Sequence, residues 1–305
     1  MDGAQTSEPG GTLGELPHHA AAVRLASALT LALLAAAASA QSGCEAEGLP
    51  DFSRLTTPPP AADSVAVRAH AVPLGDATVE VVVHERPGGR LDALVLHDDE
   101  NAGVEAALEV IAAEGGRLVE LRHTGARNVE ARVGGRAMTA DPNRIFTAAG
   151  RARTLRSLSA FSEAADAALA ALADSLRAVY TASAPAVVVT LHNNTDARYA
   201  ATSYGPGGDY EADAAAVTVH RGVDADDFFF VTDRAIYDAL VARGFNAVLQ
   251  DNAAATDDGS LSVWAAQNAR PYVNVEAQHG HVEEQARMIR ALLDVLDERA
   301  ASDTP

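Results

Sequence analysis

The run Ala186–Leu191 constrains the fold more than any other stretch of this 305-residue chain. It reads Ala-Val-Val-Val-Thr-Leu, which is apolar except at Thr190 and rich in β-branched side chains. A strand that is apolar nearly throughout must be covered on both faces, as in a sheet with helices on both sides. The polar run His192–Asp196 follows at once, so this strand leads directly into groups that are suited to chemistry.

Short β-branched runs alternate with alanine-rich helical stretches along most of the chain. We expect strands at residues 77–84, 93–97, 117–123, 129–133, 186–191, 217–220, 228–231, 245–249 and 271–276. We expect helices at residues 104–114, 155–181, 233–243 and 282–298. This alternation predicts an α/β fold, a single domain with a central mixed, largely parallel sheet flanked by helices on both faces. In such sheets the functional residues lie at the carboxyl ends of the strands.

The N-terminal segment has the composition of an export signal. Arg24 precedes the largely apolar run Leu25–Ala38, and Ala38-Ser39-Ala40 offers small side chains to a signal peptidase. We therefore expect residues 1–40 to be a signal peptide and the protein to be exported, either to the periplasm or to the extracellular space. The apolar run is too short to span a bilayer comfortably, so no transmembrane segment is expected after signal removal.

The next segment predicts a tether ahead of the folded domain. Prolines among small polar residues give residues 41–76 the composition of a flexible linker. Within it lies Cys44, the single cysteine of the chain. Small residues precede Cys44 as in lipidated proteins, but the usual Leu three places upstream is missing, so a lipid anchor is not favoured. The folded domain is expected at residues 77–300 and a C-terminal tail at 301–305.

The charge balance of the chain excludes one class of partner. Asp and Glu number 42 against 23 Lys and Arg, which gives a formal net charge of −19. Such a surface repels nucleic acid and anionic lipid, so we expect no nucleic-acid partner. An excess of carboxylates also keeps a protein soluble, and for that reason it says nothing about the substrate.

A candidate metal site begins at the end of an apolar strand. Leu94-Val95-Leu96 runs straight into His97, and Glu100 follows three positions later. Zinc binds histidine nitrogen and glutamate oxygen, and a catalytic zinc site uses three protein ligands plus water. His192 supplies a third ligand, because it follows the buried strand described above. The pair His97 and Glu100 alone is common in surface turns, whereas a second histidine at a strand end favours a metal site.

A further segment carries a resemblance to a known family. Arg136 is followed by Asp141-Pro142-Asn143-Arg144-Ile145-Phe146, and the later strand continues into Leu191-His192-Asn193. Together with the HxxE motif, this order resembles the zinc carboxypeptidase superfamily, and specifically its aspartoacylase and succinylglutamate desuccinylase branch. The resemblance covers residues 84–298 and implies one zinc ion per chain, held by His97, Glu100 and His192.

The resemblance also implies roles for four other residues. Arg136 would polarise the scissile carbonyl, and Asn143 and Arg144 would bind a carboxylate of the substrate, a task for which arginine offers fixed, bidentate geometry. Glu276, near the end of the strand expected at 271–276, would be the general base. The substrate implied is a small molecule or peptide with a free carboxylate.

The sequence departs from the branch at several positions close to these motifs. Asp98-Asp99 stands where the branch commonly has Gly-Asn, Thr190 where an Asp often precedes Leu-His, and Pro142 where Leu is usual. These changes leave the expected metal ligands intact, but they put the identity of the substrate in doubt.

Three kinds of function remain open from the sequence. The first is an exported zinc hydrolase that cleaves an amide next to a free carboxylate in a peptide, cell-wall peptide or N-acyl amino acid. The second is a catalytically inactive module that only binds a ligand on the same fold. The third is a zinc-free α/β protein such as an esterase, although the G-x-S-x-G motif of such enzymes is missing. His279 and His281 follow Glu276 closely, but histidines in a loop after a strand are more often polar surface.

Overall fold

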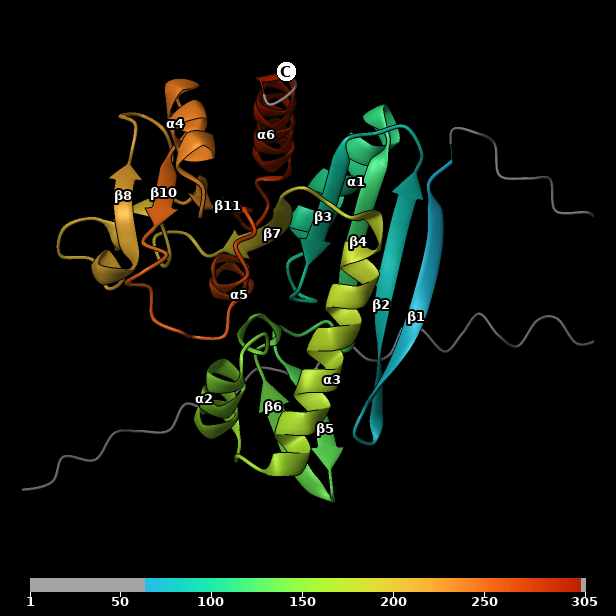
Figure 1. Ribbon diagram of the computed structural model, residues 1–305. Coiled ribbons are helices and arrows are strands. Elements are labelled where there is room, and N and C mark those ends of the chain that lie inside the picture. Colours follow the sequence, from blue (N-terminus) through green and yellow to red (C-terminus); the bar gives the residue numbers. More distant parts are fainter. Residues whose placement is uncertain (1–63, 303–305) are drawn as a thin grey trace, which may run out of the picture. The chain divides into compact units, whose positions relative to one another are not determined.

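A nine-stranded mixed sheet forms the centre of the computed structural model, which describes residues 64–302 (Figure 1). The strand order is β1-β2-β4-β3-β7-β11-β9-β10-β8. The strands are β1 Ala66–Leu74, β2 Ala77–Arg86, β3 Leu91–Val95, β4 Gly116–Arg122, β7 Val188–Asn194, β8 Ala214–Thr218, β9 Phe228–Val231, β10 Ala247–Gln250 and β11 Tyr272–Gln278. A separate hairpin contains β5 Val129–Val133 and β6 Arg136–Ala140.

The parallel strands lie at the centre of the sheet. Strands β4, β3, β7 and β11 are neighbours and all run parallel. Antiparallel pairs lie to either side, where β2 pairs with β4 and β11 pairs with β9. The expected α/β domain with a central mixed sheet is therefore confirmed, and the carboxyl ends of its parallel strands meet at one place.

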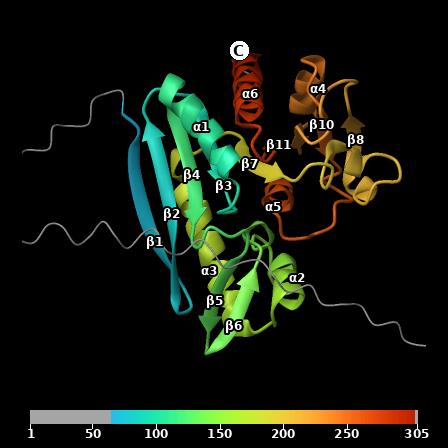
Figure 2. The same cartoon turned by 180° about the vertical axis from the view of Figure 1, so that it is seen from behind.

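Helices cover both faces of this sheet (Figure 1; Figure 2). They are α1 Asn101–Glu114, α2 Ala148–Leu158, α3 Glu163–Tyr180, α4 Arg234–Ala242, α5 Leu261–Gln267 and α6 Val282–Ser302. Helices α1, α4 and α6 pack on one face, whereas α3 and α5 pack on the other, together with α2 and the β5–β6 hairpin. Among residues 64–302, none of the helices has the length and apolarity that a bilayer crossing requires.

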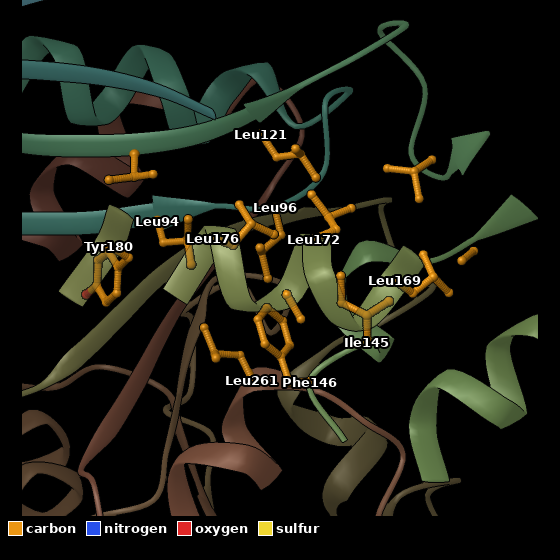
Figure 3. Packing of buried hydrophobic residues seen from close by; sticks show 14 of the residues in the cluster. Leu94, Leu96, Leu121, Ile145, Phe146, Leu169, Leu172, Leu176, Tyr180 and Leu261 are labelled. Carbon is orange, nitrogen blue, oxygen red and sulfur yellow. The ribbon is translucent and has the colours of Figure 1, made fainter. Parts of the chain in front are cut away.

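Strand β7 divides its side chains between the two cores with a period of two, as a strand covered on both faces must. Val189 and Leu191 belong to the core beneath α1, α4 and α6, whereas Val188 belongs to the opposite core beneath α3. Figure 3 shows this second core, in which Leu94 and Leu96 face Leu172 and Leu176 of α3. Thr190, His192 and Asn194 fall on the α3 side, in step with Val188. Asn193 falls on the opposite side, where it bonds to Gly103 of α1 and Gln285 of α6.

The folded domain begins earlier than the sequence predicted. Residues 41–76 were expected to be a flexible linker, but β1 lies within them and pairs along its whole length with β2. Val72 and Leu74 are buried in the core beneath α3, and this burial explains why the strand forms despite Pro73. Pro73 is tolerated because β1 is an edge strand. The expected signal peptide and Cys44 lie outside the described residues.

The single helix expected at 155–181 is also wrong, because two helices occupy this region. Helix α2 begins earlier than expected and ends at Leu158, and α3 begins at Glu163. The side chain of Ser162 accepts a hydrogen bond from the backbone N–H of Ala165 and thereby caps α3. The apolar spacing continued across this break and concealed it. Helix α6 ends at Ser302, inside the tail expected at 301–305.

We predict that Leu172→Ala lowers the free energy of unfolding by about 2–5 kcal/mol, because it opens a cavity in a fully buried site. The matched control is Leu158→Ala in α2, whose side chain is 41% exposed and should cost under about 1 kcal/mol. Urea denaturation of both variants measures the difference. Equal losses in the two variants would show that α3 does not pack as described.

Candidate metal centre and cleft

Three side chains from two parallel strands and one helix start meet at the carboxyl ends of the central strands. His97 lies two residues after β3, Glu100 is the residue that precedes α1, and His192 lies within β7. One donor atom from each of the three residues lies within 4.8 Å of the other two. The structure thus brings together the three residues that the sequence proposed as metal ligands. Strand β7 runs to Asn194, three residues beyond the expected end, so His192 is held by the sheet itself.

The donor atoms of these three residues surround one point. Nδ1 of His97 lies 2.8 Å from Oε1 of Glu100, and Nδ1 of His192 lies 2.9 Å from Oε2. The two Nδ1 atoms are 3.2 Å apart. Ligands about 2.1 Å from a tetrahedral ion lie about 3.4 Å from one another, so this spacing is close to that of a metal site. All three residues are at most 5% exposed. The donor set fits a divalent cation.

Asp141 orients the first of these histidines. Its Oδ1 lies 2.9 Å from Nε2 of His97, so it can accept the Nε2–H and leave Nδ1 as the atom that would bind a cation. Metal-binding histidines commonly donate their other ring N–H to a carboxylate in this way. Asp141 stood in the motif that the sequence analysis singled out, but this role was not predicted. Its contact with His97 depends on the tertiary structure.

Arg127 is the arginine that lies beside the candidate metal centre, and the structure does not bring Arg136, which was expected to polarise the scissile carbonyl, to this place. Nη1 of Arg127 donates to Oε1 of Glu100 at 2.8 Å, and Arg127 lines the cleft. Arg136 is exposed at the far end of the β5–β6 hairpin, where it pairs with Val133. At about 3.4 Å per strand residue, its backbone lies roughly 17 Å from Asp141. Arg127 lies in the polar loop before β5, and nothing in the sequence around it distinguishes it from an ordinary surface arginine.

The two residues proposed to bind substrate both line the cleft. The amide of Asn143 is largely engaged within the protein, since its Oδ1 accepts from the N–H of Leu261 and its Nδ2 lies 3.4 Å from Nε2 of His192. Nε of Arg144 lies 3.3 Å from a carboxylate oxygen of Asp258. Side chains of Arg144 and Asp258 are each about one third exposed, so both can meet a ligand.

Glu276 faces the metal centre from the neighbouring strand. In the parallel ladder of β11 and β7 it is the register partner of His192, and it lines the cleft while only 4% exposed. Burial, with repulsion from Glu100, raises the pKa of Glu276 to about 8. A hydrogen bond of 2.8 Å from Nδ2 of Asn274 to Oε2 opposes this shift. A buried carboxyl whose pKa lies near neutrality is suited to proton transfer.

The two histidines that follow Glu276 have different surroundings. His279 is exposed and lines the cleft, whereas His281 forms an ion pair with Asp227 at 2.9 Å outside it. A second group of possible metal ligands contains Asp224, Asp227 and His281, and one donor atom of each lies within 4.8 Å of the others. Asp227 already accepts hydrogen bonds from His281 and from the N–H of Gln278, so the group is satisfied without an ion.

The cleft above the metal centre has a volume of about 680 Å³. Its walls combine aromatic rings with charged groups of both signs. Tyr199, Tyr204 and Tyr210 pack edge to face or tilted against one another on one side, with ring centroids 5.3–5.9 Å apart. A cleft of this size accommodates a small molecule or a short peptide segment.

Comparisons with known proteins give matches of fold only. No family model matches the chain, and no curated protein matches it either. Solved structures that match include a murein-tripeptide amidase and an aspartoacylase family protein. The murein-tripeptide amidase of Escherichia coli O157 is 14% identical, covers 78% of this chain and 95% of its own, and has a TM-score of 0.41. An aspartoacylase family protein of Mesorhizobium loti is 14% identical, covers 78% of this chain and 69% of its own, and has a TM-score of 0.39.

We predict that this site takes up a divalent cation more tightly as pH rises. Burial alone would lower the pKa of His97, but attraction to Glu100 and the bond with Asp141 outweigh it and raise the pKa to about 9. Burial lowers the pKa of His192, so this ring is already neutral near pH 7. A proton must therefore leave His97 when the cation binds, and affinity should rise about tenfold per pH unit below that pKa.

Competition titrations of the metal-free protein with a chromophoric chelator, using Zn²⁺ as the probe, measure this dependence. Between pH 6 and pH 8 the affinity should rise about 100-fold. Calorimetry in two buffers of different ionisation enthalpy should report about one proton released per ion. An affinity that does not change over this range would contradict the arrangement of His97 between two carboxylates.

Proposed function

We propose that this chain is a zinc-dependent hydrolase that cleaves an amide bond next to a free carboxylate. The observation that carries the proposal is the convergence of His97, Glu100 and His192 on one point, with the buried carboxyl of Glu276 beside them. Two imidazoles and one carboxylate are the ligands of catalytic zinc in several peptidases. One ion per chain is expected.

The proposed reaction needs an activated water molecule and a proton carrier. A zinc ion held by the three ligands would act as a Lewis acid that lowers the pKa of water and polarises the substrate carbonyl. Glu276 would accept a proton from the attacking water and then deliver it to the leaving amine. Burial raises the pKa of Glu276 to about 8, which is close to neutral pH, so the same carboxyl can both accept and release a proton.

Two arginines on the cleft walls would stabilise the negative charges that the substrate carries or develops during the reaction. Nη1 of Arg127 donates a hydrogen bond to Glu100, which places the guanidinium next to the candidate metal centre. From there Arg127 would stabilise the charge that develops on the carbonyl oxygen. Arg144 would bind the carboxylate of the substrate by charge-assisted hydrogen bonds. The side chain of Asn143 accepts a hydrogen bond from the backbone N–H of Leu261 through Oδ1, and this bond holds the cleft wall around Arg144 in place.

We also propose that the enzyme acts outside the cytoplasm. This part of the proposal rests on the sequence of the first forty residues, where Arg24, an apolar run and Ala38-Ser39-Ala40 follow one another. Peptides, cell-wall peptides and N-acyl amino acids are the substrate classes that it would meet there.

We predict that Glu276→Gln lowers kcat by about 10²–10⁴-fold while the protein still binds about one zinc ion. His97→Ala should instead lose the metal, because it removes a ligand. A screen of N-acyl amino acids and short peptides for chelator-sensitive hydrolysis identifies the substrate, and metal analysis accompanies each variant. The control is Glu211→Gln, which removes an exposed carboxyl outside the cleft lining. Zinc binding without turnover of any substrate would favour a module that only binds its ligand.

We predict that Arg127→Ala lowers kcat by about 10²–10³-fold, because it removes the cationic group nearest to the carbonyl site. Arg136→Ala is the matched control and should leave kcat and KM within about twofold, since this side chain is exposed at the distal hairpin. Steady-state kinetics on the best substrate compares the two variants. A large loss in Arg136→Ala with none in Arg127→Ala would reverse the assignment.

A further inference from the structure

Beneath Glu276 lies a chain of buried polar side chains that the proposed mechanism does not use. Its members are Tyr272, Thr190 and Asn274, which are 2%, 0% and 6% exposed. Resting on the proposed function, we propose that these three side chains position Glu276 as the general base. Tyr272 and Asn274 also line the cleft, whereas Thr190 does not, so Thr190 acts through Glu276 without reaching the cleft itself.

The hydrogen bonds of this chain connect two strands of the sheet. The hydroxyl of Tyr272 lies 2.6 Å from Oγ1 of Thr190. Oγ1 of Thr190 donates to Oδ1 of Asn274 at 3.3 Å, and Nδ2 of Asn274 donates to Oε2 of Glu276 at 2.8 Å. The register explains the alignment, since Thr190 is opposite Asn274 in the parallel ladder, just as His192 is opposite Glu276.

The direction of these hydrogen bonds is determined by counting protons. Thr190 has one hydroxyl proton, and its bond to the carbonyl oxygen of Asn274 uses it. Tyr272 must therefore be the donor to Thr190. Because Asn274 accepts through Oδ1, its amide is oriented with the N–H groups toward Glu276. Each of these hydrogen bonds is therefore donated in the direction of the carboxyl of Glu276. Donation to a carboxyl favours its ionised form.

This arrangement gives the two oxygens of Glu276 different tasks. Oε2 is held by Asn274, whereas Oε1 has no hydrogen bond to any of residues 64–302 that the structure records. The free oxygen is the one available to take a proton, and the bond at Oε2 restricts rotation of the carboxyl. Positioning of reacting groups matters strongly, because a displacement of about 1 Å can cost roughly 100-fold in rate.

A purely structural explanation of the three residues is incomplete. Buried polar groups are usually hydrogen-bonded, and these are. However, Thr190 is the polar residue within the apolar run of residues 186–191. Valine at this position would fill nearly the same space, but it would leave Tyr272 and Asn274 without this hydrogen-bonding partner. The hydrogen bonds of this hydroxyl to Tyr272 and Asn274 offset the cost of burying it, and the hydrogen-bonded series to which they belong ends at the cleft carboxyl of Glu276.

The test compares substitutions that keep or remove the hydroxyls. Thr190→Val removes the donor to Asn274 at nearly constant volume, whereas Thr190→Ser keeps the hydroxyl and loses a methyl group. Tyr272→Phe removes the first donor. Its control is Tyr237→Phe, because the hydroxyl of Tyr237 forms a similar 2.7 Å bond to Thr218. Tyr237 lies outside the cleft, whereas Tyr272 is among the residues that line it.

Three measurements are made on each variant of the full chain: zinc content, kcat and KM, and the conformation of Glu276 in crystal structures. We expect Thr190→Val to bind zinc normally, to lower kcat about 10- to 100-fold with KM unchanged, and to show Glu276 in more than one conformer. Thr190→Ser should recover most of kcat even though its Tm is lower. Tyr272→Phe should resemble Thr190→Val more weakly, and Tyr237→Phe should resemble the wild type.

Two results would overturn the positioning role. One is a single, unchanged conformer of Glu276 in both Thr190→Val and Tyr272→Phe. The other is a kcat that follows the Tm of the variants, with Thr190→Ser as impaired as Thr190→Val. If the wild type hydrolyses no substrate, the proposed function fails. The crystal structures of the variants still decide whether the hydrogen bonds from Tyr272 through Thr190 and Asn274 hold Glu276 in place.

Discussion

The parallel register between β7 and β11 is the constraint on which the candidate site depends. It sets His192 beside Glu276 and Thr190 beside Asn274, so that a proposed metal ligand, a proposed base and their supporting groups come from two adjacent strands. A shift of one residue would turn the side chains of the shifted strand to the opposite face, into the apolar core beneath α1 and α6. The alternating apolar residues Val189 and Leu191 prevent that shift, because they would have to leave the core. Hydrophobic packing thus determines the geometry of the polar site.

Electrostatics in the cleft differ from those of the chain as a whole. Although the formal net charge is −19, the carboxylates at the metal centre each have a cationic or hydrogen-bonding partner. Glu100 meets two imidazoles and Arg127, and the pKa of Glu100 is held far below its usual range despite burial. Among residues 64–302, Glu276 has a hydrogen bond from Asn274 but no cationic side chain in direct contact, and its pKa is raised. Glu100 is thereby kept ionised, as its proposed role as a cation ligand requires, whereas Glu276 has the pKa that its proposed role in proton transfer requires. The environments of the two carboxyls separate these roles.

Patterns within one element were predicted well from the sequence, and patterns across elements were not. The spacing of His97 and Glu100, and the position of His192 after an apolar run, led to three residues that the structure brings together. The helix expected at 155–181 was wrong because apolar spacing continued through a break that a single serine cap creates. Strand β1 was missed because prolines and small polar residues dominated its surroundings, whereas its pairing with β2 depends on distant residues.

The sequence by itself determined the α/β class of the fold, the apolar strands and the polar residues at their ends, because these follow from the periodicity of single elements. Only the tertiary structure decided which arginine lies at the metal centre. Arg127 and Arg136 are both in polar surroundings of the sequence, and the turn of the β5–β6 hairpin carries the second away from the site while the first contacts Glu100. The roles of Asp141 and Asn274 were likewise decided by folding. A hydrogen bond requires two groups to meet at about 3 Å, and local sequence patterns do not specify which distant groups meet.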